Sequence, residues 1–185
     1  MQARRKTPGD IKEASPAALA RARVLNTTDA DYLARVATDP NALLRMCVVD
    51  NPHAPLPVVL QLAGDSDADV RAYVARQRLT ETHQAPLRLI ETLAADDDPR
   101  IRLALARYFY TPRHVLMRLA ADDDVEVRHT VANRRNVPDE VVAVLCEDRD
   151  RHVRGAARYT ARQRARNPRD RRHRSGAHPQ AANRE

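Results

Sequence analysis

Aliphatic and charged positions recur together along this chain at nearly constant intervals. Five segments carry an aliphatic residue followed by Arg, at spacings of 26, 31, 26 and 26 residues: Leu44-Arg45, Val70-Arg71, Ile101-Arg102, Val127-Arg128 and Val153-Arg154. An Asp precedes each Arg by six residues, and another aliphatic residue precedes each Asp by three. A fixed period of this length is typical of repeat architectures. We therefore predict consecutive units of about 26 residues, the second lengthened by an insertion near Leu79 to His83.

Each unit is expected to contain two short helices. In the fourth unit, the acidic run Asp122 to Asp124 supplies an N-cap and negative charge for the first helix. Pro138 suits the first position of the second helix, because its missing N–H costs nothing there, and in the third unit Thr111 before Pro112 adds a cap. Apolar residues then follow three, four and seven positions after each proline, which indicates a helical stripe rather than a strand. The stripe consists of Val58, Val59, Leu62, Leu89, Ile90, Leu93, Val115, Leu116, Leu119, Val141, Val142 and Leu145.

Helices of about eight to ten residues are marginal in isolation, so they need packing against neighbouring units. Each fully buried Leu or Val contributes roughly 1.5–3 kcal/mol. The expected fold is all-α: a right-handed α-solenoid of about five two-helix repeats of roughly 26 residues, spanning residues 16–160. Leu19 to Val36 is expected to cap the stack, with Thr28 and Asp29 at the start of a helix. Residues 1–15 and 161–185 are expected to be disordered basic ends.

The recurring segments resemble the leucine-rich repeat variant family and, more broadly, HEAT-like helical repeats. The resemblance rests on LAADDDVEVRHTVANRRNVPDEVV, LAADDDPRIRLALARYFYTPRHVL and LAGDSDADVRAYVA, and extends over roughly Leu33 to Thr160. It implies an interaction scaffold rather than an enzyme. The family prototype carries a cysteine-rich iron–sulfur segment ahead of its repeats, which this chain lacks. We therefore expect no cofactor.

Charge is concentrated at the two ends of the chain. The formal net charge is +7, of which residues 161–185 contribute +6 and residues 1–13 contribute +2, leaving −1 for residues 14–160. The basic character is therefore a property of the ends rather than of the folded body. An Arg-rich tail of this kind can bind a nucleic-acid backbone without sequence preference. Docking on an acidic protein and an inert extension are the alternatives.

The Asp and the Arg of each unit carry opposite charges at a fixed spacing. HEAT-like repeats link adjacent units through a ladder of matching residues, so the resemblance implies the same here. We expect the Asp residues to cap helices and the Arg residues to pair with them. The alternative is an anion site built from the Arg residues. The ladder set is Asp39, Asp65, Asp96, Asp122 and Asp148 with Arg45, Arg71, Arg102, Arg128 and Arg154.

A second set of Arg and Tyr residues recurs at the break between the two helices of each unit. One interpretation is that Arg near helix C-termini complements the helix dipole. The other is a surface for an anionic partner, with Tyr108 or Tyr110 stacking and Arg134 or Arg135 contacting phosphate or carboxylate. At least one of Tyr108, Phe109 and Tyr110 is expected to belong to the core. The candidate partner-binding residues, which we call the Arg/Tyr edge, are Arg76, Arg78, Arg107, Tyr108, Tyr110, Arg134, Arg135 and Arg158.

These features favour a non-enzymatic, cytoplasmic scaffold that binds a protein partner. A nucleic-acid-associated protein using the tail and the Arg/Tyr edge is the alternative. A HEAT-like DNA glycosylase is disfavoured, because there is no Trp and the body carries almost no net charge. Neither the scattered His residues nor Cys47 and Cys146 have the spacing of a catalytic or metal site. The chain contains no stretch of about 18 apolar residues, so we expect no membrane span. The sequence leaves the oligomeric state open.

Overall fold

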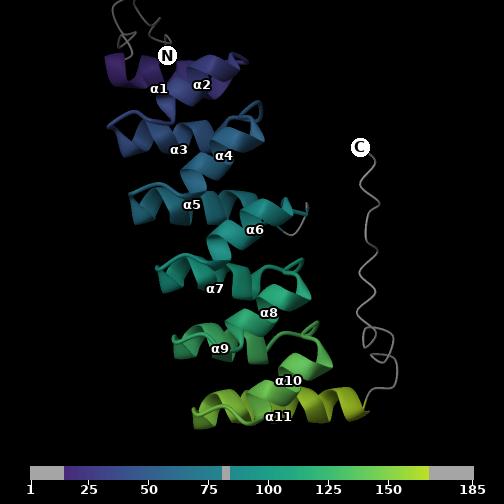
Figure 1. The fold of residues 1–185 in the computed structure, drawn as a ribbon. Coiled ribbons are helices and arrows are strands. Elements are labelled where there is room, and N and C mark those ends of the chain that lie inside the picture. Colours follow the sequence, from purple (N-terminus) through teal and green to yellow (C-terminus); the bar gives the residue numbers. More distant parts are fainter. Residues whose placement is uncertain (1–14, 81–83, 167–185) are drawn as a thin grey trace, which may run out of the picture. The chain divides into compact units, whose positions relative to one another are not determined.

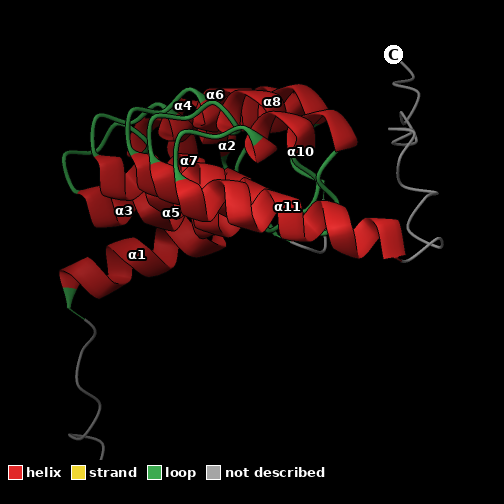
Figure 2. Ribbon diagram, turned by 90° about the horizontal axis from the view of Figure 1, so that it is seen from below, coloured by secondary structure: helices red, strands yellow, loops and turns green. Residues whose placement is uncertain are grey.

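The computed structural model describes residues 15–80 and 84–166, and every regular element in this part of the chain is an α-helix (Figure 2). The all-α class is therefore confirmed for these residues. Among their helices, none combines the length and the apolar character needed to cross a membrane. Residues 1–14 and 167–185, which include most of the two expected disordered ends, lie outside the described residues.

The chain forms two compact units, residues 1–62 and residues 63–185, whereas the sequence predicts one domain over residues 16–160. In the first unit, α1 and α2 both pack on α3. Asp29 accepts a hydrogen bond from the Tyr32 N–H as the N-cap of α2, which confirms the predicted helix start. The elements are α1 (Pro16–Asn26), α2 (Ala30–Val36), α3 (Ala42–Asp50) and α4 (Leu56–Ala63), whose last residue belongs to the second unit.

The second unit consists of two rows of helices. In the first row each helix packs on the next, in the order α5, α7, α9, α11 (Figure 1). The helices of the second row alternate with them along the chain: α6 packs on α7 and α8, and α10 packs on α9 and α11. The bounds are α5 (Ala68–Arg78), α6 (Leu87–Ala94), α7 (Pro99–Arg107), α8 (Arg113–Leu119), α9 (Val125–Ala132), α10 (Asp139–Cys146) and α11 (Arg151–Arg166).

The core is aliphatic and follows the predicted stripe. All twelve stripe residues, from Val58 to Leu145, are buried. In the first-row helices of the second unit, the aliphatic residue before each ladder Arg is buried as well, at Val70, Ile101, Val127 and Val153. The helical period of the sequence therefore identifies the inward face of both rows correctly.

The helix starts differ from the prediction by one or two residues. The N-cap of each first-row helix is the residue two positions after the ladder Asp; Asp98, for example, accepts from the Arg100 N–H. The prolines occupy the N-cap of the second-row helices rather than their first turn, as at Pro86, Pro112 and Pro138. Thr111 does not cap α8, because its hydroxyl donates to the carbonyls of Leu105 and Tyr108 at the end of α7.

Two boundaries of the predicted repeats can also be compared with the structure. α5 ends at Arg78, directly before the predicted insertion, and residues 81–83 of the insertion lie outside the described residues. The predicted tail begins at residue 161, but α11 continues to Arg166. Side-chain contacts to neighbouring turns hold this extension: Arg164 binds the Asp139 carboxylate at 3.0 Å and the Arg135 carbonyl at 2.8 Å.

Candidate functional site

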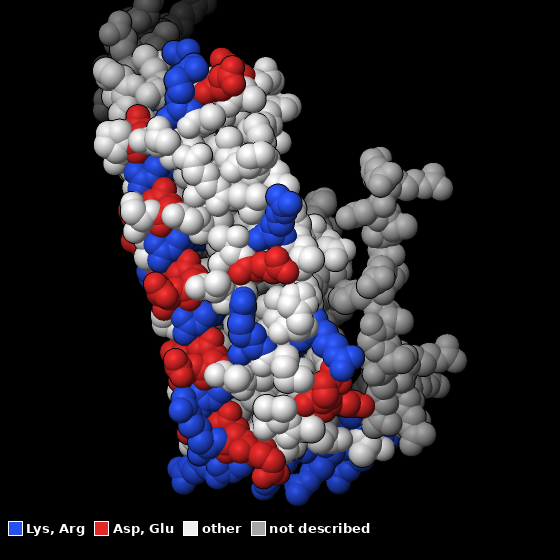
Figure 3. Space-filling model, in the orientation of Figure 1, with Lys and Arg blue, Asp and Glu red and all other residues white. Residues whose placement is uncertain are grey.

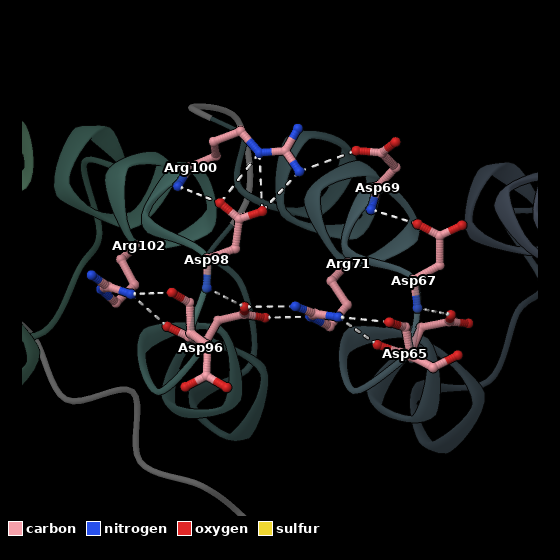
Figure 4. A network of polar contacts seen from close by, with 10 residues as sticks. Asp65, Asp67, Asp69, Arg71, Asp96, Asp98, Arg100 and Arg102 are labelled. Carbon is pink, nitrogen blue, oxygen red and sulfur yellow. Dashed lines mark hydrogen bonds and ion pairs between the residues drawn. The ribbon is translucent and has the colours of Figure 1, made fainter.

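The ladder Arg residues join consecutive helices of the first row (Figure 4). Arg71 on α5 donates from Nε and Nη2 to the two carboxylate oxygens of Asp96, at 2.7 and 3.0 Å. Its Nη1 donates to the carbonyl of Asp65 in its own unit at 2.7 Å. Two parallel charge-assisted hydrogen bonds fix the relative orientation of the two groups as well as adding energy. Arg71 thus pairs with the Asp side chain of the next unit and donates to a backbone carbonyl of its own unit.

The same arrangement recurs further along the row. Arg102 pairs with Asp122 at 2.7 and 2.8 Å, and Arg128 pairs with Asp148 at 2.8 and 3.2 Å. The three Asp side chains are only 4% to 6% exposed, and the side chain of Arg128 is 5% exposed. Because these guanidinium groups already hold carboxylates, they leave little capacity for the alternative anion site. In Figure 3 the alternating acidic and basic side chains form a band along one edge.

The ladder Asp also organises the turn that follows it. The Oδ1 atoms of Asp96, Asp122 and Asp148 accept a hydrogen bond from the N–H two residues further on, at 2.7 to 2.9 Å. The predicted capping role of the ladder Asp is therefore wrong in detail: the ladder Asp fixes the turn, and the Asp two positions later caps the helix. In the first unit, Asp39 fixes its turn in the same way, and Arg45 donates to its carbonyl.

Two of the ladder carboxylates, those of Asp122 and Asp148, have depressed pKa values. Burial alone would raise the pKa of Asp122, but the hydrogen bonds from Arg102 and the Asp124 N–H outweigh it and lower the pKa below the ordinary value of 3.8. The pKa of Asp148 is lowered in the same way, where the bonds from Arg128 and the Asp150 N–H outweigh burial. Both groups are therefore ionised in the folded protein wherever an unperturbed Asp would be.

Acid is expected to weaken this network. Since these pKa values are lower in the folded protein, the unfolded chain takes up protons at a higher pH than the folded protein does. The contribution of the two carboxylates to the free energy of unfolding is therefore lost as the pH falls below about 3.8. We predict that the melting temperature falls steeply below pH 4. The melting temperature of Asp122→Asn should be lower than that of the unchanged protein at pH 6 and should fall less as the pH is lowered. The two curves of melting temperature against pH should therefore converge. Parallel curves in thermal unfolding followed by circular dichroism would contradict this role for Asp122.

The Arg/Tyr edge is divided between the interior and the surface. Tyr108 is buried, and its hydroxyl accepts a hydrogen bond from the Ala85 N–H at 2.6 Å, so its predicted stacking role on the surface is wrong. Burial also raises the pKa of Tyr108. Arg134 is buried too, and donates to the carbonyls of Ala106, Tyr108 and Phe109 at 2.6 to 3.1 Å. Its predicted contact with a partner's phosphate or carboxylate is therefore replaced by an internal one.

Arg134 belongs to a recurring contact that the sequence analysis missed. Twelve residues after the ladder Asp, the side chains of Asn51, Arg134 and Thr160 each donate to carbonyls near the end of an earlier helix, which is α1, α7 and α9 respectively. Asn51, in the first unit, donates to Val24 and Thr27. These side chains satisfy carbonyls that a helix end leaves without an internal donor. The available signal was a side chain with a hydrogen-bond donor at the same position of these three units.

The remaining residues of the edge lie nearer the surface. Arg76, Arg107, Arg135 and Arg158 are exposed, whereas Arg78 and Tyr110 are half-buried. Arg76 lies over the ring of Tyr73, 4.8 Å from its centroid, rather than beside a neighbouring unit's aromatic residue. The structure therefore keeps half of the eight candidate residues exposed.

Phe109 is the exposed aromatic residue of this edge. Its side chain is 53% exposed, and its ring meets Tyr110 edge to face, with 5.1 Å between centroids. Its carbonyl accepts hydrogen bonds from Arg134 Nη2 at 3.1 Å and from Asn136 Nδ2 at 2.9 Å. The turn that carries this apolar side chain is thus held in one conformation from the neighbouring unit.

Within the described residues, no cluster of three or more His, Cys, Asp or Glu side chains is arranged to hold a metal ion. An open hollow of about 270 Å³ lies over the Arg128–Asp148 pair and includes Asp123 and Arg149 in its lining. Its most buried polar groups are already paired in the ladder. Comparison with known proteins gives no match: no family model, curated protein or solved structure corresponds to the chain.

Proposed function

We propose that this protein is a non-enzymatic helical-repeat scaffold that binds a protein partner. The finer architecture belongs to this proposal: a right-handed α-solenoid of about five two-helix repeats, as the resemblance to leucine-rich repeat variant and HEAT-like proteins implies. The contacts between consecutive first-row helices and the repeated Arg–Asp pairs support it. In such a stack the polar residues inside the row hold the units together, and the turns at its edge are available for binding.

The observation that carries the proposal is the geometry of Phe109. A largely exposed aromatic side chain on a turn fixed by Arg134 and Asn136 needs little ordering when a partner binds. Binding is favoured by such preorganisation, because the entropy of ordering the surface is not lost on association. Aromatic residues and Arg are also the residue types that dominate protein interfaces. Arg107 and Arg135, both exposed on the same edge, provide the polar surroundings.

Phe109→Ala is expected to reduce partner capture at least tenfold without lowering the melting temperature by more than a few degrees. Truncating an anchor of this kind typically costs at least about 2 kcal/mol of binding energy. The measurement is an affinity pull-down from the native cell with nuclease added, quantified by mass spectrometry. Proteins captured by the unchanged chain and lost with Phe109→Ala are the expected partners.

Val125→Ala is the matched control, because Val125 is 40% exposed and begins α9, whereas the Arg/Tyr residues of this unit follow the end of that helix. It should leave the captured set unchanged. Loss of the same proteins in both variants would indicate non-specific apolar adhesion and contradict the proposal. Capture that disappears with nuclease alone would contradict a direct protein partner.

A further inference from the structure

The last helix of the row carries a continuous stripe of Arg along its exposed side. Within α11, five of the six Arg residues occur at intervals of three, four, four and four residues, which places these five on one face of the helix. The opposite face contains the buried residues Val153 and Ala157. Neighbouring Arg residues are about 6 Å apart along an axis of about 24 Å. The Arg stripe consists of Arg151, Arg154, Arg158, Arg162 and Arg166.

Arg154 is a ladder residue whose pairing edge is open. Its Nη1 donates to the Asp148 carbonyl at 2.5 Å, the same backbone contact that Arg71, Arg102 and Arg128 make. Those three Arg residues use Nε and Nη2 to hold the Asp of the next unit. Within residues 15–80 and 84–166, no carboxylate pairs with Nε or Nη2 of Arg154. A guanidinium fork held in this way is preorganised for an oxygen anion.

Arg158 occupies a position that holds a small buried residue in the preceding first-row helices. The residue ten positions after the ladder Asp is Ala75, Ala106 or Ala132 in the preceding helices of the second unit, and each is buried. In α11 this position is Arg158, whose side chain is 54% exposed. A further helix packed in the same register would bury this cation. The occupant of this face therefore has a different chemistry from a further repeat.

α11 carries a large positive charge that carboxylates within the helix do not balance. The helix contains six Arg and no acidic residue. Among the described residues, the stripe makes one ion pair, between Arg158 and Glu147 at 3.8 Å. Arg162 and Arg166 are exposed and make no ion pair within residues 15–80 and 84–166. Figure 3 shows the resulting basic surface along the lower edge, where Figure 1 places α11.

We propose that the exposed face of α11 binds the phosphodiester backbone of a single-stranded nucleic acid. A row of regularly spaced guanidinium groups matches a polymer with one anionic charge per nucleotide, and Arg binds phosphate oxygens through two parallel hydrogen bonds. Tyr159 lies next to the stripe and is 62% exposed, which offers an unpaired base a ring to stack on. The proposal does not depend on Phe109, which belongs to the turn after α7 rather than to α11.

The test compares three full-length variants that each replace three Arg residues with Gln. The stripe variant changes Arg151, Arg158 and Arg162. The tail variant changes Arg171, Arg172 and Arg174, and the remote variant changes the exposed residues Arg21, Arg88 and Arg118. All three lose the same net charge. Binding of a fluorescent 20-nucleotide single strand is measured by anisotropy between 50 and 300 mM salt.

We expect the stripe variant to bind at least tenfold more weakly than the remote variant, with an unchanged melting temperature. Because each phosphate contact contributes about 0.7 to the slope of log K against log salt for single strands, this slope should fall by about 2. A stripe variant that binds as well as the remote one would overturn the proposal. So would a larger loss in the tail variant, or equal competition by polyglutamate, which would indicate an acidic protein partner. Phe109→Ala should retain this binding, so the two proposals fail separately.

Discussion

Replacing Arg128 with Ala is expected to lower the free energy of unfolding by about 3–5 kcal/mol, the range observed when one partner of a buried ion pair is removed. The substitution leaves the Asp148 carboxylate buried without its cation. It also removes the Nη1 donor from the carbonyls of Asp122 and Asp123. Both losses fall between α9 and the turn before α11, so the effect should appear as a much lower midpoint in urea-induced unfolding.

Arg100→Ala provides the matched control. Arg100 also binds two Asp residues, Asp69 and Asp98, but its side chain is 61% exposed. Solvent-exposed ion pairs contribute roughly 0–1 kcal/mol, because water and salt screen them. If both variants lose the same stability, burial does not strengthen the ladder and the interpretation is wrong.

Replacing Arg134 with Met is expected to cost about 2–4 kcal/mol. Three carbonyls at the end of α7 and in its turn lose their donor, and a buried acceptor left without a partner costs about 1–3 kcal/mol. The loss of stability is partly offset, because the substitution also removes a buried cation. Burial of this cation is unfavourable and lowers the pKa of Arg134 to about 10. Met preserves the length of the aliphatic stem, so the change reports mainly on the lost donors.

Arg135→Met tests the neighbouring side chain, which is exposed. A surface substitution away from specific contacts usually changes stability by less than about 0.5 kcal/mol. We expect hydrogen exchange to accelerate at the end of α7 in Arg134→Met alone. An equal loss of stability in both variants would show that the carbonyl contacts of Arg134 contribute little.

The helical class and the inward face of each helix could be predicted from the sequence. Leu93, Leu119 and Leu145 recur in a helical period with no competing strand pattern, and all three are buried. The helix starts were harder to locate, because each turn offers Asp residues two positions apart. Choosing between Asp96 and Asp98 as the cap requires knowing that Arg71 from the preceding unit already holds Asp96.

The candidate site was predicted less well, for a similar reason. A residue between two helices can point into the neighbouring unit or away from it, and its sequence position does not distinguish the two. Tyr108 and Arg134 point inward, whereas Phe109, one residue from Tyr108, is exposed. The end of the row was also misplaced, because the Arg content of residues 161–166 suggested disorder. Contacts from Arg164 to Asp139 and Arg135 instead keep these residues helical.

The most direct test of the central claim, that buried Arg–Asp pairs tie each unit to the next, is a double-mutant cycle on Arg128 and Asp148. Urea unfolding of the unchanged protein, Arg128→Ala, Asp148→Ala and the double variant gives the coupling energy of the pair. Contacting residues of this kind show couplings of about 0.5–3 kcal/mol, and we predict a value above about 1.5 kcal/mol in favour of the pair. A coupling near zero, with the two single losses simply adding, would contradict the account.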